Sequence, residues 1–109
     1  MSAHKYGLHG KLTAKHGKRD ELVEILLKAA DAVNNAKGCR VYFISTYPSD
    51  KNSVWVTEAW DSKADHDDSL QSPKVKSLIS RAIPLLDKKP EQGQILEVWG
   101  GAGFSNQVY

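Results

Sequence analysis

Residues 41–60 read VYFISTYPSDKNSVWVTEAW, two runs of β-branched and aromatic residues on either side of a polar segment. Such residues suit the pleated surface of a strand. The segment between them, Pro48 to Asn52, is rich in residues that form turns. We therefore expect a β-hairpin whose strands cover about 41–47 and 54–60.

The two strands of this hairpin carry large residues at both alternating positions. In the first run, Val41, Phe43 and Tyr47 share one side and Tyr42 and Ile44 the other. A sheet with one wet face would alternate apolar with polar residues. We therefore expect both faces of the sheet to be covered, one by helices of the same chain and the other by a second copy of the chain.

The remaining elements follow from the periodicity on either side of the hairpin. Weak alternation over 6–14 predicts a first strand, and apolar residues at helical spacing over 22–33 predict a long helix. The acidic stretch 61–72 predicts a short crossover helix, 73–86 a further helix, and 94–99 a last strand. This order, strand, helix, strand, strand, helices, strand, predicts an α+β ferredoxin-like fold, with helices on one face of a four-stranded antiparallel sheet.

Length and composition predict one small domain. The chain has 109 residues, of which 40% are hydrophobic. We expect the domain to cover 1–103, with a glycine-rich run leading into a tail at 104–109 that could lie on a partner subunit.

Charge and cysteine content limit the partners and the location that we expect. The net charge of +2 arises from basic and acidic residues mixed along the chain, so nucleic acid is not an expected partner. No segment has the apolar length of a membrane span or a signal peptide. The lone Cys39 cannot form an internal disulfide and fits a reducing cytoplasm.

One motif identifies a possible family. Residues 58–64 read Glu-x-Trp-Asp-Ser-x-Ala, and Leu-Gln-Ser-Pro follows at 70–73. With the glycine turn before the first helix and the step Gly38-Cys39, this pattern resembles the antibiotic biosynthesis monooxygenases of the dimeric α/β barrel superfamily, over about 6–99. The resemblance implies a homodimer that oxidises a small quinol or phenolic aromatic with dioxygen and uses no cofactor.

The family also leaves alternatives open. Its members include haem-degrading enzymes, which fit this chain least, and an isomerase. Many relatives carry a histidine where this chain has Ser69. The alternative interpretation is therefore a non-catalytic dimeric protein of the same fold that binds a small molecule or serves in a stress response.

His66 and Trp60 are the candidate catalytic residues. Cofactor-free oxygenation needs a group that takes a proton from the substrate hydroxyl, and an imidazole changes charge near physiological pH. Trp60 offers an apolar wall with an N–H donor. In the competing interpretations, His66 is a surface residue of a solvated acidic helix and Trp60 belongs only to the core.

Glu58, Tyr47 and His9 are the candidate substrate-binding residues. Glu58 shares a strand side with Trp60, so it is either a pocket carboxylate or the partner of a cation such as Arg40 or Arg81. We expect the pairing with a cation, because buried carboxylates are rarely left alone. The sequence does not decide whether Tyr47 and His9 face the pocket or a dimer interface. No metal site is predicted, because His66 has no second histidine nearby.

Overall fold

The computed structural model describes residues 4–104 and confirms the α+β fold expected from the sequence. Its elements are β1 (Lys5–Thr13), α1 (Arg19–Val33), β2 (Cys39–Ser45), β3 (Ser53–Trp60), α2 (Lys63–Ser69), α3 (Pro73–Ala82), the short 3₁₀ helix η1 (Ile83–Leu85) and β4 (Gln94–Val98). Of the predicted tail, residues 105–109 lie outside the described part, so its role stays a prediction.

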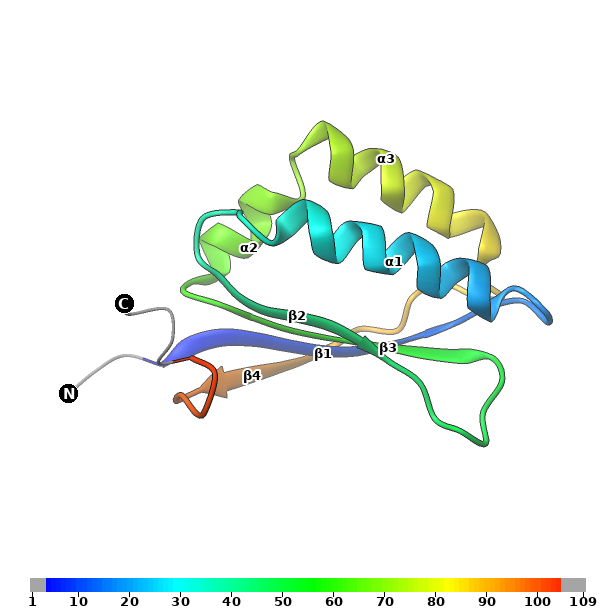
Figure 1. Cartoon of the computed structure of the whole chain (residues 1–109), viewed down its shortest axis with the longest axis horizontal. Coiled ribbons are helices and arrows are strands. Elements are labelled where there is room, and N and C mark those ends of the chain that lie inside the picture. The colour runs from blue at the N-terminus through cyan, green and yellow to red at the C-terminus, as the bar shows by residue number, and fades with distance from the viewer. Residues whose placement is uncertain (1–3, 105–109) are drawn as a thin grey trace.

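The four strands form one antiparallel sheet in the order β2-β3-β1-β4. All three α-helices lie on the same side of this sheet, with α1 and α3 side by side (Figure 1). The sheet therefore has an inner face under the helices and an outer face that residues 4–104 leave uncovered.

Strand register fixes which side chains point to the helices. Leu8 of β1 and Tyr42 of β2 both pair with Glu58, so these residues form one row across the inner face. Successive side chains alternate between faces, which places Val54, Val56 and Trp60 on the inner face as well. The largest fully buried side chains, Leu22, Val54 and Trp60, fill the space between α1 and the sheet.

Local signals in the sequence explain where several elements begin. The Ser62 hydroxyl accepts a hydrogen bond from the Asp65 backbone N–H and caps α2, and Ser72 caps α3 in the same way just before Pro73. Gly38, which links α1 to β2, has a φ of +80°. A Cβ on Gly38 would also overlap the Asp65 carboxylate, so a glycine is required there.

The second strand differs from its predicted bounds. It begins at Cys39, where a bulge between Cys39 and Val41 shifts the register, and it ends at Ser45 rather than at Tyr47. The turn starts earlier than expected because the Asp50 backbone N–H bonds to the Tyr47 carbonyl. Tyr47 therefore lies in the loop beyond β2.

The outer face exposes several large apolar side chains. Phe43 is 50% exposed and Leu96 42%, and Tyr47, whose ring stands edge-on to Trp55, extends this apolar surface. Beneath it, the Trp55 indole nitrogen is buried without a hydrogen-bond partner among the described residues. We call this surface, defined by Phe43, Tyr47, Trp55 and Leu96, the outer apolar face.

Candidate active site

Glu58 lies at the centre of the candidate site. Its position on β3 points its carboxylate under the helices, where only 14% of the side chain is exposed. The Trp60 indole Nε1–H donates a hydrogen bond of 3.0 Å to Glu58 Oε1. Because Trp60 itself is completely buried, this donor is held in a fixed position against the carboxylate.

His66 meets the same carboxylate from α2. Its Nε2 lies 3.7 Å from Glu58 Oε1, and 12% of its side chain is exposed. The imidazole packs edge-on against Trp60 and at a tilt against Tyr6, with ring centroids 5.8 and 5.5 Å away. The structure thus brings together three of the five residues selected from the sequence, and His66 is not a solvated surface residue.

The other ring nitrogen of His66 is held by Asp67. The distance from His66 Nδ1 to Asp67 Oδ1 is 2.9 Å. Hydrogen bonds from Lys63 and His66 hold the pKa of Asp67 below its usual value, so its carboxylate is ionised and can only accept. Nδ1 therefore carries the proton in this contact, and Nε2 is the nitrogen turned toward Glu58 and free to accept a proton.

Burial sets the electrostatics of the site. Desolvation raises the pKa of Glu58 above its usual value, although the Trp60 hydrogen bond and the nearby His66 act in the opposite direction. The pKa of the neighbouring Tyr42 is also raised, mainly by burial and further by the charge of Glu58. The Tyr42 hydroxyl thus stays protonated and can serve as a donor.

The raised pKa of Glu58 predicts a pH-dependent stability difference for Glu58→Gln. A carboxyl whose pKa is raised on folding destabilises the protein once it is ionised, so stability falls as pH rises from the ordinary value of 4.5 through the raised one. Glutamine keeps an oxygen for the Trp60 donor and removes the charge. We expect the variant to melt above the parent at pH 7 and this gap to close below pH 4.5, in thermal unfolding followed by circular dichroism.

The matched control for this experiment is Glu24→Gln, which changes an exposed glutamate on α1. It should show no such pH-dependent gap. A Glu58→Gln protein that melts below the parent at pH 7 would show that its attraction to His66 outweighs the burial of the charge.

A cavity of about 220 Å³ lies beside these groups, between the helices and the inner face of the sheet. Its polar lining residues are Tyr42, Glu58, His66 and Ser69, and the rest of the lining is aliphatic or proline. Trp60 is not part of the lining but supports Glu58 from behind. An apolar enclosure with a few convergent polar groups is typical of a small-molecule site.

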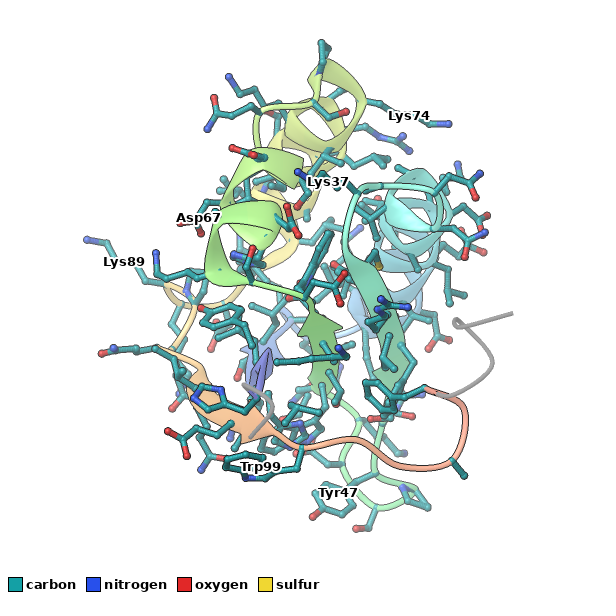
Figure 2. All side chains as sticks on the ribbon, turned by 90° about the vertical axis from the view of Figure 1, so that its left-hand side faces the viewer. Lys37, Tyr47, Asp67, Lys74, Lys89 and Trp99 are labelled. Atoms are coloured by element: carbon teal, nitrogen blue, oxygen red, sulfur yellow. The ribbon has the colours of Figure 1, made fainter. Side chains whose placement is uncertain are left out.

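Tyr47 and His9 do not lie at this cavity. His9 stacks on Trp55 at 4.9 Å between ring centroids and bonds to Thr57, and the Tyr47 ring stands edge-on to Trp55. With Trp55 they line a separate hollow on the outer side of the sheet. In Figure 2 the labelled Tyr47 and Trp99 lie far from the helices, whereas Asp67 lies on α2.

The expectation that Arg40 or Arg81 pairs with Glu58 is wrong. Arg40 lies at the bulge of β2 and makes two hydrogen bonds to the Asp61 carboxylate, of 2.7 and 3.2 Å. Arg81 lines a surface hollow between α1 and α3. Glu58 takes its hydrogen bond from Trp60 instead, two residues further along the same side of the strand.

The sequence interpretation missed Tyr42 and the aliphatic side chains of α1 and α3 that line the cavity. They looked like ordinary core residues. Ile79 of α3 and Ile83 of η1 are the lining residues that differ from the core, because both are large apolar side chains left partly exposed. Both line the cavity and are still 40% and 58% exposed, so they mark its mouth.

Within residues 4–104, no three His, Cys, Asp or Glu side chains are grouped so that they could hold a metal ion. A membrane-spanning helix, which would need to be longer and more apolar, is likewise not found among the described residues.

Comparison with known proteins identifies the family of this chain. The family model for antibiotic biosynthesis monooxygenases matches residues 6–81. A solved structure described as a "putative antibiotic biosynthesis monooxygenase" from Chloroflexus aurantiacus J-10-fl shares 35% identity with this chain, with a TM-score of 0.83 over 92% of this chain and 98% of the other. The protein therefore belongs to the antibiotic biosynthesis monooxygenase family.

More distant structures support the fold alone. A protein from Caulobacter crescentus CB15 with the same description has 19% identity and a TM-score of 0.81, over 90% of this chain and 92% of the other. A conserved protein from Methanosarcina mazei Go1 has 18% identity and a TM-score of 0.79, over 88% and 94% of the two chains. A comparison with curated proteins gave no significant match.

Proposed function

We propose that this protein is a cofactor-independent monooxygenase that oxidises a small quinol or phenolic aromatic with dioxygen. The observation that carries the proposal is the cluster of Glu58, Trp60 and His66 at the wall of a mostly apolar cavity. Membership of the family supports the reaction class.

In the proposed reaction, His66 Nε2 takes the proton of a substrate hydroxyl, and the Asp67 contact on Nδ1 stabilises the resulting imidazolium. The substrate anion gives an electron to dioxygen, and the two radicals combine at a ring carbon. Loss of water from the hydroperoxide leaves a carbonyl, so that a phenol and dioxygen yield a quinone and water. No external reductant is needed, because the substrate supplies all four electrons.

The apolar lining contributes by excluding water from the anion and from the oxygen intermediate. The Tyr42 hydroxyl, which burial keeps protonated, is the donor that we assign to the substrate oxygen. The Glu58 carboxylate, itself held by Trp60, lies 3.7 Å from Nε2 and stabilises the imidazolium that forms when His66 takes the proton.

We also propose that the protein acts as a homodimer joined through the outer apolar face. Half-exposed Phe43 and the unpartnered Trp55 indole nitrogen support this assembly, since a second copy would cover the first and can supply an acceptor for the second. His9 and Tyr47 would then lie at the interface rather than in the pocket.

Oxygen uptake tests the proposed activity. We expect the purified protein, without added metal, flavin or haem, to consume one dioxygen per quinol or phenol oxidised above the autoxidation rate. With ¹⁸O₂, one labelled atom should enter the product and the other should appear in water. Saturable binding of these substrates with no enzymatic oxygen uptake would contradict the proposal and favour a binding protein of the same fold.

A further inference from the structure

The cavity beside Glu58 adjoins another hollow. A second hollow of about 240 Å³ lies between the inner face and the segment before β4, and it shares Leu12, Leu26, Tyr42 and Glu58 with the first. Because these four residues line both spaces, the two hollows are adjacent, with Glu58 between them, and we call them the first and the second lobe.

The first lobe is polar at one end only. His66, Ser69 and Glu58 lie where α2 covers the end of β3, whereas Ala82, Ile83 and Leu86 line the far end. Figure 1 shows the same division in space, since α3 runs away from α2 along the sheet. A ligand that satisfies this lobe carries its polar group at the α2 end and apolar atoms along α3.

The first lobe is also long and narrow. On its floor, Leu12 pairs with Val54, four residues from Glu58 along β3, which spans about 13 Å. On its roof, Val75 to Ile83 spans about 12 Å of helix. A cavity of about 150 Å³ is enough for benzene. A volume of 220 Å³ drawn out over this length therefore fits one ring followed by a chain better than fused rings.

We infer that the substrate is a single-ring phenol or quinol with an unbranched apolar side chain, the ring at Glu58 and His66 and the chain along α1 and α3. This inference names the substrate class of the proposed function and rests on it. The exposed Ile79 and Ile83 at the mouth would contact the chain as it enters.

The second lobe is distinguished by Gly10. This glycine lies on the inner face of β1 between Leu8 and Leu12, and the missing side chain leaves the hollow open. A Cβ there would meet only the Gly93 Cα, at 3.5 Å, which is an ordinary contact. Gly10→Val can therefore fill the second lobe, while Ala82→Leu blocks the far end of the first.

Calorimetric titration with phenol and with 4-alkylphenols of increasing chain length tests the inference on the parent protein. Each methylene buried in an apolar site contributes enough free energy to tighten binding about fourfold. We expect the dissociation constant to fall by roughly that factor per carbon until the lobe is full. A dissociation constant that does not change with chain length would overturn the inference.

Two variants show which lobe holds the alkyl chain of the ligand. Ala82→Leu should shorten the range of chain lengths over which affinity rises and leave phenol binding within about twofold, whereas Gly10→Val should leave that range unchanged. The opposite pattern would place the chain in the second lobe and refute the assignment. Thermal unfolding of each variant checks that it folds. If a variant fails to fold, the titration of the parent protein with the alkylphenols still tests the inference.

The binding series separates this inference from the proposed activity. A rising affinity along the alkylphenols without oxygen uptake on any quinol would refute the monooxygenase and keep the ligand class. Oxygen uptake on methyl-substituted quinols, together with alkylphenol affinities that do not change with chain length, would support the monooxygenase and refute the ligand class.

Discussion

Replacing His66 by Ala is expected to lower the turnover of an accepted quinol by roughly 10²–10⁴-fold, the usual contribution of a general base. The reason is geometric. His66 Nε2 faces the cavity end where Glu58 lies, and Nδ1 is occupied by Asp67. Among the described residues that line this cavity, His66 is the one that carries an imidazole, so its loss removes the proposed proton acceptor. Steady-state oxygen uptake with kcat and KM determined separately measures the effect, which should appear mainly in kcat.

Two variants serve as controls for this loss. His16→Ala removes an exposed imidazole from the turn before α1 and should leave turnover unchanged. Trp60→Phe keeps an aromatic ring but removes the donor to Glu58, so it should raise KM while the pH dependence of turnover stays in place. Equal oxygen uptake by the His66→Ala protein and the parent would remove His66 from the mechanism.

A quinol with a more acidic hydroxyl should depend less on His66. Less proton transfer is then required of the protein, so the ratio of parent to variant turnover should decrease across a series of such substrates. A constant ratio would indicate that His66 positions the ring rather than accepting its proton.

The fold was predictable because its signals are local. Alternation placed Leu8 and Leu12 on one side of the first strand, and the serines at positions 62 and 72 marked two helix starts. Each of these features depends on neighbours within a few residues, for which strand and helix geometry are fixed. The order of the elements then followed from their sequence.

The site was predictable only in part because its contacts are not local. Trp60 and Glu58 lie on the same side of one strand, so their association followed from the alternation. The pairing of Arg40 with Asp61, in contrast, depends on a bulge in β2 that no residue type in the sequence predicted. Tyr47 was misplaced for a similar reason, since the strand ends two residues before it.

Ser69 illustrates the same limit. Its side chain lines the cavity, and its hydroxyl donates a hydrogen bond of 2.6 Å to the His66 backbone carbonyl. It therefore supports the helix turn that presents His66. Spacing along the sequence showed that the two residues are one helical turn apart, but not that the His66 imidazole lies at the cavity beside Glu58.

Phe43→Glu is expected to convert the proposed dimer into monomers. Phe43 is half exposed in the single chain, so burying the rest of its ring at an interface contributes about 0.75–1.5 kcal/mol, and a twofold interface contains it twice. Losing this burial weakens association by about 10- to 10²-fold, and an unpaired carboxylate at the interface weakens it further. Analytical ultracentrifugation across micromolar concentrations measures the change.

Leu27→Glu is the matched control, because Leu27 is also 50% exposed but lies on α1, on the opposite side of the molecule from the outer apolar face. Both variants introduce the same charge at the same exposure, so a general effect of lost hydrophobicity would appear in both. If the interface is the outer apolar face, only Phe43→Glu dissociates, and Trp55 fluorescence should shift as its indole meets water. A parent protein that is monomeric at these concentrations would exclude the proposed dimer. Dissociation by Leu27→Glu alone would place the interface on the helical side of the molecule.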